Sequence, residues 1–460
     1  MSTQYQMYCP DIPSLLPASA QEWLPEDHLA YVVRDVARSL DLTAIHLWYS
    51  SDPRGARPFD PLMMVSLLLY AWCSDIYSSR RISMLCIGDL GGRYLAAGQQ
   101  PDFRTISKFR LRHGEALADL FVQSVRLCQS AGMVSLGHVA VDGTKLAANA
   151  SKHKAMSYGR MVRTESDLRA EIAEIERRSN AVDSMEDALF GAENAGIDLP
   201  KELKFRETRL ARILEAKVQL ELEARQAAEA RAAKREAKRP KDDGKPRRGP
   251  KPKDPATVLP PDTAQRGFTD PDSRIMKAGT GEYLQGYNAQ AAVDCDHQVI
   301  VGCDLTNMAA DAPHLQPLMK QVAENTGGMP VEVSADAGYF SAANVASQTT
   351  PYCQPYIPPD RQKHGRSATA ENSDCTTDAP SAASRMRQLL STPEGRNAYA
   401  NRMKTVEPVF GQIKGCPGSP GLRQFLRRGL PKALQEWRWR CAAHNIKKYM
   451  RHQLALNASK

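Results

Sequence analysis

Two aspartates, Asp142 and Asp336, have a sequence setting that favours metal chemistry. Each closes a short apolar stretch expected to be a β-strand, and a glycine follows each within two residues. Where neighbouring strands of a sheet end together, such carboxylates meet at one edge, and carboxylate oxygens are ligands that Mg²⁺ and Mn²⁺ prefer. A single aspartate at a strand end is more often a turn or cap residue. Two or three together can hold a pair of metal ions.

A third acid, Glu407, lies in a segment with the pattern of a helix. Lys414 follows it by seven residues, which places both on one helix face, and Tyr399 and Arg402 are neighbours three residues apart. Pro408 lacks a backbone donor and predicts a new helical turn at Glu407. The segment therefore offers an acid for metal and basic groups for phosphate, although spacing alone equally fits a solvated amphipathic helix.

The elements that must position these residues follow a recognisable order. We expect a strand ending at Asp142, an antiparallel pair of strands over 287–306, a helix over 314–324 and a strand ending at Asp336, followed by a helix, a short strand and the helix with Glu407. This is the order of the ribonuclease H-like fold. We therefore predict an α/β protein with a mixed sheet and flanking helices, formed by residues 131–155 and 265–455.

The N-terminal part, residues 1–130, has a helical pattern and is expected to be an all-α DNA-binding domain. One segment, which begins at Pro101, interleaves apolar residues with Lys108, Arg110 and Arg112. A basic helix with an apolar underside suits a module that contacts DNA, and a solvated surface helix fits equally well.

Two further segments interrupt the expected sheet domain. Residues 156–239 carry two apolar stripes at helical spacing and predict a coiled-coil-like helical hairpin, inserted between the first and second strands. Residues 240–264 predict a basic flexible linker, which either binds phosphates or is a solvated tether. Residues 231–253 contain eleven Lys or Arg and three acids, so this window carries +8 of the chain's +9. Residues 361–385 lack aromatics, Leu, Ile and Val and predict a disordered loop.

The composition narrows the class of protein. The ten cysteines contain no Cys-x-x-Cys pair, which favours reduced thiols in the cytoplasm over a disulfide scaffold or a zinc site. The most apolar run, residues 62–73, is shorter than the roughly 18 to 20 residues that span a bilayer. Asp60 and Pro61 before it predict the start of a buried helix, so we expect no membrane segment.

Four motifs in order give the sequence a family resemblance. It resembles the DDE-type transposases of bacterial insertion sequences, in the branch with an N-terminal helical domain and a Tyr-Arg-Glu-Lys signature. The motifs are AVDGTKLAANAS around Asp142, TDPDSRIMK with QGYNAQAAVD over 269–294, ADAGYFS around Asp336 and VEPVFGQIKG around Glu407. The segment PDFRTISKFR is also similar to the N-terminal domain of that group.

The resemblance implies a function and roles for individual residues. It implies that Asp142, Asp336 and Glu407 form the catalytic triad and hold two Mg²⁺ (or Mn²⁺) ions. It also implies that Tyr399, Arg402 and Lys414 contact the phosphate of the transposon end. The partners implied are the terminal inverted repeats and target DNA, bound by a homodimer in the bacterial cytoplasm at the nucleoid.

One spacing departs from the family pattern. Four residues separate Arg402 from Glu407, where the usual signature has three, and on a regular helix the extra residue turns Arg402 by about 100°. The role of Arg402 is therefore open, and Lys404 is an alternative phosphate contact. Two other classes also remain: another ribonuclease H-like nuclease, or a catalytically inactive DNA-binding derivative.

Overall fold

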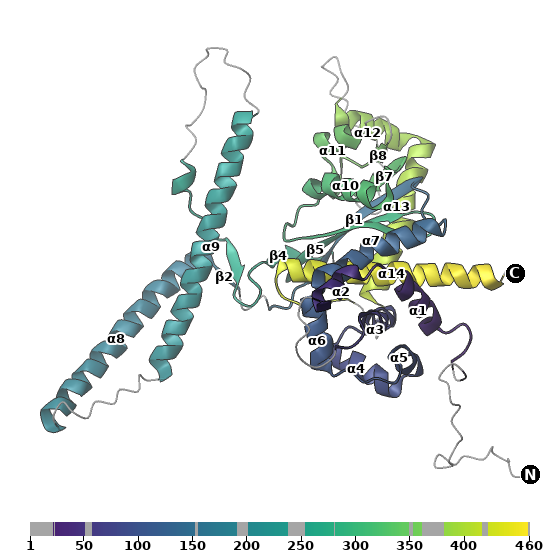
Figure 1. The fold of residues 1–460 in the computed structure, drawn as a ribbon. Helices are drawn as coiled ribbons and strands as arrows, with labels where there is room; N and C mark the ends of the chain where they lie inside the picture. Colours follow the sequence, from purple (N-terminus) through teal and green to yellow (C-terminus); the bar gives the residue numbers. More distant parts are fainter. Residues whose placement is uncertain are drawn as a thin grey trace, which may run out of the picture.

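The structure is a computed structural model, and it describes residues 22, 24–50, 58–151, 155–190, 201–237, 254–279, 281–348, 353–360, 381–415 and 422–458. A mixed sheet with helices on both faces lies beside a bundle of N-terminal helices, and a pair of long helices extends away from both (Figure 1). The expected α/β class, with a ribonuclease H-like mixed sheet and an N-terminal helical part, is confirmed.

The main sheet has six strands in the order β4-β5-β1-β7-β8, with β6 also paired to β5. β1 is antiparallel to β5 and parallel to β7, and β7 is parallel to β8. β4 and β6 both pair antiparallel with β5, each with a different part of this long strand. The strands are β1 (His138–Ala147), β4 (Arg274–Lys277), β5 (Tyr283–Asp294), β6 (Ile300–Thr306), β7 (Glu332–Ala335) and β8 (Gln354–Tyr356).

The prediction that the first strand ends at Asp142 is wrong. β1 continues five residues further, because its pairing with β5 extends to Ala147 opposite Gly286. What ends at this point is the parallel pairing with β7, whose last pair is Val141 with Ala335. Asp142 therefore lies inside a strand, at the position where one of its two neighbours stops.

Helices cover both faces of the sheet. On one face, Gly302 of β6 lies against Leu318 and Val322 of α10. On the other face lie α13 and α14, where Phe410 of α13 stacks with Trp437 of α14. The apolar residues between these layers form one buried cluster that includes Val141, Ala335 and much of β5 and β6. The helices are α10 (Leu315–Thr326), α11 (Ala342–Gln348), α12 (Ala382–Ser391), α13 (Pro393–Lys414) and α14 (Leu430–Ala458).

The N-terminal helices form a second core, around the apolar helix α3. Asp60 caps this helix by accepting a hydrogen bond from the Leu62 amide at 2.7 Å, and Pro61 occupies its first position, as expected from the sequence. Trp439 and Ile446 of α14 are part of the same core. The helices are α1 (Leu29–Ser39), α2 (Thr43–Ser50), α3 (Pro61–Cys73), α4 (Ser79–Gly88), α5 (Leu90–Leu95), α6 (Phe103–Arg112) and α7 (Gly114–Ser130).

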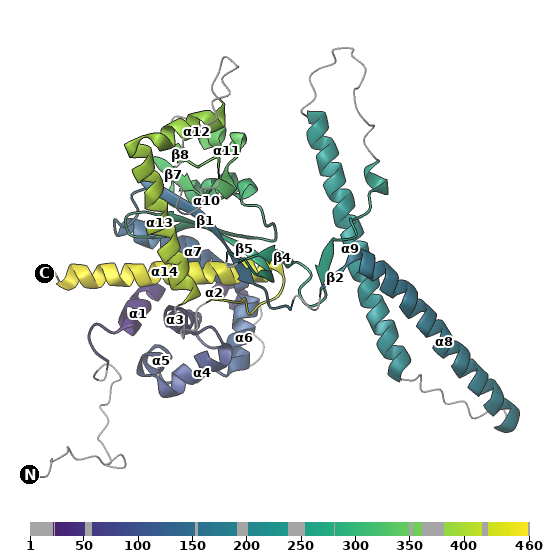
Figure 2. The ribbon, with the colours of Figure 1, turned by 180° about the vertical axis from the view of Figure 1, so that it is seen from behind.

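The helix α14 joins the two cores. It packs on α7 and α3 of the N-terminal helices and on β6 of the sheet. Figure 2 shows it running between the helical bundle and the sheet. Trp72 of α3 and Trp439 of α14 stack with ring centroids 5.2 Å apart and planes 7° apart. The N-terminal helices and the sheet are therefore packed on a shared helix.

The long helices α8 (Tyr158–Phe190) and α9 (Lys201–Ala237) lie within the segment expected to be a helical hairpin. Their base is attached by a small two-stranded sheet, in which β2 (Ala155–Ser157) pairs antiparallel with β3 (Gln265–Gly267). A separate apolar cluster around Met161, Leu168 and Ile213 holds the two helices together at this base. We call α8, α9 and the β2–β3 sheet the helical arm.

Two expected flexible segments are described only at their ends. Residues 240–253 of the expected linker lie outside the described residues, whereas 254–264 contain the short helix η4 (Pro255–Thr257) and hydrogen-bond to Tyr158 and Gly159. Most of the expected disordered loop, residues 361–380, also lies outside them. Its last residues are ordered, because Ser381 caps α12 by accepting a hydrogen bond from the Ser384 amide.

In the described part of the chain, none of the helices is both long enough and apolar enough to cross a membrane.

Candidate active site

The strand register brings Asp142 and Asp336 together. Val141 of β1 and Ala335 of β7 form the last parallel pair, so the two aspartates that follow them are neighbours at the point where the strands part. Asp142 accepts a hydrogen bond from the Gly143 amide at 2.8 Å, and Asp336 accepts one from the Gly338 amide at 2.9 Å. Each carboxylate is thus held by the backbone amide of the glycine that follows it.

The third acid reaches this site through an arginine. Arg402 of α13 donates to Oδ2 of Asp142 at 2.8 Å, and its other terminal nitrogen lies 4.0 Å from Oε1 of Glu407. The guanidinium is largely buried, with 12 % of the side chain exposed, whereas Glu407 is 54 % exposed. The structure therefore brings all three predicted acids to one region, with the guanidinium of Arg402 between Asp142 and Glu407.

Pro408 does not start a new helix, and the expectation of a fresh turn at Glu407 is wrong. α13 runs without interruption from Pro393 to Lys414. Pro408 has no amide proton to donate to the Lys404 carbonyl. Instead, the side chain of Gln298 donates to that carbonyl at 3.1 Å. This contact satisfies the acceptor that the proline leaves free and keeps Glu407 on a continuous helix.

The remaining signature residues surround the same site. Tyr399 lies one turn before Arg402, and the guanidinium carbon is 5.7 Å from the centre of its ring. Lys414 is half-buried and interacts electrostatically with Asp142. Lys404, the alternative phosphate contact, is exposed. Tyr399, Arg402 and Lys414 thus lie around Asp142, and Arg402 points at an acid in this structure.

Burial dominates the electrostatics of the site. It raises the pKa of Asp142 to about 6, against the opposing effect of Arg402 and with a further increase from Asp336. Burial and the charge of Asp311 raise the pKa of Asp336. Burial alone would lower the pKa of Arg402, but Asp142 and the neighbouring groups hold it above its usual value. The site therefore stabilises positive charge.

The donor set fits a hard divalent cation by its chemistry, since its ligands are carboxylate oxygens. Its spacing is wider than one ion needs. Within the described residues, no three Asp, Glu, His or Cys side chains lie close enough together to hold a metal ion. Arg402 provides the positive charge between Asp142 and Glu407 in this arrangement.

Sequence reasoning missed a second set of polar residues beside the aspartates. Asp311 precedes the short helix η5 (Ala312–His314), and it pairs with Lys145 of β1 at 3.0 Å. Asn288 and Gln290 of β5 also donate to it. A signal was present, because Asn288 and Gln290 are two residues apart in the expected strand and therefore point to the same face.

The three basic residues predicted to contact DNA have different environments. Lys108 and Arg112 are exposed on α6, and Arg112 stacks on Trp48 at 4.0 Å from the ring centre. Arg110 is 7 % exposed and donates to the Tyr77 carbonyl at 2.7 Å. The structure places Arg110 in the interior, against Trp439 of α14 at 5.1 Å, because it faces the second core.

The TDPD motif supports the start of α14. Asp270 is fully buried and accepts hydrogen bonds from the hydroxyl of Tyr287 at 2.8 Å and the amide of Gly429 at 3.2 Å. Asp272 accepts from the amide of Leu430 at 2.9 Å. These contacts attach β4 and β5 to the first turn of α14, which gives the motif a structural role.

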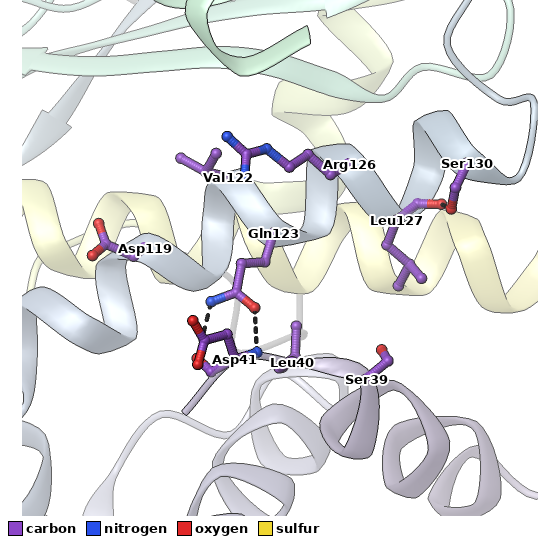
Figure 3. Close-up of a pocket in the computed structure, with 9 residues that line it drawn as sticks. All are labelled: Ser39, Leu40, Asp41, Asp119, Val122, Gln123, Arg126, Leu127 and Ser130. Atoms are coloured by element: carbon purple, nitrogen blue, oxygen red, sulfur yellow. Dashed lines mark hydrogen bonds between the residues drawn. The ribbon is translucent and has the colours of Figure 1, made fainter. Parts of the chain in front are cut away.

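A pocket of about 590 Å³ lies elsewhere, between the end of α1 and the helix α7. Figure 3 shows Gln123 of α7 facing Asp41, with two hydrogen bonds between the side-chain amide and the backbone of Asp41. Asp119 and Arg126 line the same pocket. None of the predicted site residues is among its lining residues.

Comparisons with known proteins match both ends of the chain. Residues 18–112, which include most of the N-terminal helices, match the family described as Transposase domain (DUF772). Residues 353–450, which include α13 and most of α14, match the family described as Transposase DDE domain. A search of curated proteins and a search of solved structures each gave no match. The two family matches, one in each end region of the chain, indicate an insertion-sequence DDE transposase.

Proposed function

We propose that this transposase binds the ends of its own transposon and cuts and joins DNA strands at the site formed by Asp142, Asp336 and Glu407. The observation that carries the proposal is the strand register, which makes Asp142 and Asp336 neighbours, together with Arg402, which links Asp142 to Glu407. The three acids come from positions 142, 336 and 407, so their meeting depends on the whole fold.

The chemistry proposed is two successive phosphoryl transfers. A water attacks the phosphodiester at the transposon end, and the bond to the 3′ oxygen breaks, which frees a 3′-hydroxyl. That hydroxyl then attacks a phosphodiester of target DNA and displaces another 3′ oxygen, without a covalent bond to the protein. When bound, two Mg²⁺ (or Mn²⁺) ions supply Lewis acidity, lower the pKa of the attacking group and offset charge on the phosphate.

The residues of the chain position the substrate in this scheme. The three carboxylates would hold the cations, and Tyr399, Arg402 and Lys414, which lie around Asp142, would contact the scissile phosphate. Exposed Lys108 and Arg112 of α6 suit contacts to the DNA backbone through released counterions. We propose that a homodimer holds two transposon ends in the bacterial cytoplasm, at the nucleoid.

The test is strand cleavage of a plasmid that carries the DNA flanking this reading frame, in Mg²⁺. We expect Asp142→Ala, Asp336→Ala and Glu407→Ala each to lower the cleavage rate by about three orders of magnitude or more, with binding to the same DNA largely unchanged. Glu324→Gln, which changes an exposed acid on α10, serves as the matched control. Cleavage by Asp336→Ala at the wild-type rate would refute the assignment.

The same assay separates the alternatives. Joining of cut ends to a second plasmid distinguishes a transposase from a nuclease that only cuts. Binding without metal-dependent nicking by the wild-type protein would identify an inactive DNA-binding derivative.

A further inference from the structure

The loop that precedes α14 joins the same edge of β1 as the proposed active site. β5 pairs with one edge of β1 from Val139 to Ala147, whereas β7 pairs with the other edge only as far as Val141. Among the described residues, the next backbone partner on that second edge is Gln424, which forms a parallel bridge with Ala147. We call residues 422–428 the basic loop.

The basic loop is thus placed at a set distance from the aspartates. Asp142 and Ala147 are five residues apart on one strand, which is about 16 Å at the usual rise per residue. A second connection runs through α13. The Leu422 amide donates to the carbonyl of Ile413 at 2.9 Å, and the next residue of the helix, Lys414, interacts electrostatically with Asp142. The loop and the acids therefore share both a strand and a helix.

Hydrogen bonds hold the backbone of the basic loop on two sides. On the β1 side, the Ala147 amide donates to the carbonyl of Arg423 at 3.3 Å, and the Phe425 amide donates to the carbonyl of Ala147 at 2.9 Å. On the α14 side, the buried carboxylate of Glu436 accepts from the two loop amides that follow Phe425, at 3.0 and 3.1 Å. The ring of Phe425 is itself buried. The loop therefore presents its other side chains from a fixed backbone.

The basic loop and the start of α14 carry positive charge only. Residues 422–432 contain four Lys or Arg and no acid. Arg423 and Arg428 are exposed, and within the described part of the chain neither forms an ion pair. Arg428 donates through Nε to the carbonyl of Asn149 at 3.1 Å, and among the described residues its two terminal nitrogens have no acceptor. Both guanidinium groups are therefore available to an anion.

Three acids packed around the basic loop bind backbone amides instead of these two arginines. Asp270 and Asp272 accept from amides at the start of α14, and Glu436 accepts from the loop amides described above. The third arginine of the loop, Arg427, is half-buried and lies 5.0 Å from the centre of the Trp439 ring. The charge that the loop presents outward thus comes from its other two arginines.

We infer that Arg423 and Arg428 bind the phosphate backbone of the transposon-end DNA while its end lies at the proposed active site. The inference rests on the proposed function, because it assigns a second contact to the same substrate. Guanidinium groups suit phosphate oxygens, since they donate two parallel hydrogen bonds and stay charged. The separation of about 16 Å corresponds to about five base pairs of duplex DNA. The loop therefore sets the register of the duplex relative to the acids, without reading its sequence.

The experiment measures the affinity of the full-length protein for a labelled duplex from the DNA flanking this reading frame, by fluorescence anisotropy at several salt concentrations. We expect Arg423→Gln/Arg428→Gln to weaken binding by about tenfold or more at about 0.1 M salt. The slope of log affinity against log salt concentration should fall in magnitude by about two, because about 0.9 counterions are released per phosphate contact. Arg423→Lys/Arg428→Lys keeps both charges and should keep the slope.

A matched control removes the same charge elsewhere. Arg385→Gln/Arg451→Gln changes exposed arginines on α12 and near the far end of the 29-residue helix α14, and it should bind DNA with the wild-type salt slope. Circular dichroism checks that each variant is folded. If Arg423→Gln/Arg428→Gln is not folded, Arg423→Gln alone is measured, because that side chain makes no hydrogen bond to any described residue. The slope should then fall in magnitude by about one.

The outcomes separate this inference from the function on which it rests. Wild-type affinity in Arg423→Gln/Arg428→Gln, a loss of affinity without a change of slope, or an equal change in the control would overturn the inference and leave the proposed function in place. A reduced slope in that variant alone, with the slope kept in Arg423→Lys/Arg428→Lys, supports the inference. A wild-type protein that binds no DNA would overturn both. DNA binding by the wild type without metal-dependent cleavage would overturn the proposed function but not the phosphate contact.

Discussion

Arg402 contacts two acids of the proposed triad, and this gives the unusual spacing before Glu407 a physical meaning. The extra residue leaves the guanidinium aimed at Asp142 and still within 4.0 Å of Glu407. A buried carboxylate without a partner is strongly disfavoured, so Arg402 stabilises the ionised form of Asp142. The signature residue therefore organises the acids, whatever its contact with phosphate.

Arg402→Gln should slow DNA cleavage by about 10- to 100-fold, because a charge-assisted hydrogen bond of this kind contributes about 1.5–3 kcal/mol. Without the guanidinium, the pKa of Asp142 rises further, since Arg402 is the main effect that lowers it. The cleavage rate of Arg402→Lys should lie between those of the wild type and Arg402→Gln, because lysine keeps the charge but loses the second contact. Single-turnover cleavage rates provide the measurement.

Arg396→Gln is the matched control for this series, since Arg396 is an exposed arginine on the same helix. Equal cleavage rates for Arg402→Gln and Arg396→Gln would show that Arg402 does not organise the acids.

Among the elements, the helix α14 contributes to both apolar cores, and it carries a buried histidine. His444 lies 5 % exposed, with Nε2 2.9 Å from the carbonyl oxygen of Gln298. Burial, together with the charges of Lys448, Lys447 and Arg451, lowers its pKa to about 4, against the opposing effect of the hydrogen bond to Gln298. The folded protein therefore holds this imidazole neutral, whereas the unfolded chain protonates it near its usual pKa of 6.5.

Stability should fall with pH because of His444. A lowered folded-state pKa means that the unfolded state binds the proton first, so stability is lost as the pH falls from about 6.5 to about 4. The loss should be on the order of 2 to 3 kcal/mol. Urea unfolding at pH 7 and at pH 4.5 measures it for the wild type and for His444→Gln. An equally steep decrease in His444→Gln would show that other groups cause it.

The sequence allowed the element order to be predicted, but not the partners of each element. The apolar runs and helical stripes were sufficient to predict the order of strands and helices, and to place Asp142, Asp336 and Glu407 within that order. The true length of β1 depends on β5, which begins over 130 residues later, so Asp142 was misplaced relative to the strand end. The hydrogen bonds that Asp311 accepts depend on the same pairing, because Lys145 and Asn288 are brought opposite each other only in the sheet.

The burial of Arg110 could not be predicted from the sequence either, because it depends on packing between distant segments. Its helix α6 was predicted correctly from apolar and basic alternation. Which basic residues face outward depends on α14, over 300 residues away, whose Trp439 lies against Arg110.

At the scale of the whole molecule, two apolar cores are connected by one helix. Trp437 of α14 belongs to the core of the sheet, and Trp439 belongs to the core of the N-terminal helices. Both side chains are fully buried. We therefore expect the N-terminal helices and the sheet to unfold together.

Trp439→Ala tests this coupling. The change should lower the free energy of unfolding by about 3–5 kcal/mol, because it leaves a cavity beside Trp72. Unfolding in urea should remain a single transition by both fluorescence and circular dichroism. Tyr283→Ala, at an exposed position on β5, should change stability by about 0.5 kcal/mol or less. Two separate transitions in the wild type would contradict the coupling.

We expect the helical arm to be a separate folding unit, so that the rest of the protein folds without it. Ala155 pairs directly with Gly267, so the two ends of the insertion lie side by side and a short Gly-Ser linker can join them. A variant with residues 156–266 replaced in this way should keep its melting temperature within about 5 °C of the wild type. Aggregation of the purified variant would show that the arm is needed for folding.

The position of α14 in the chain has a consequence for biosynthesis. Every other described element is translated before this helix, yet both cores need its side chains to be complete. A nascent chain that has not yet produced Trp437 and Trp439 lacks part of the core of the sheet and part of the core of the N-terminal helices. The two cores therefore become complete at the same time, once the ribosome has released this helix.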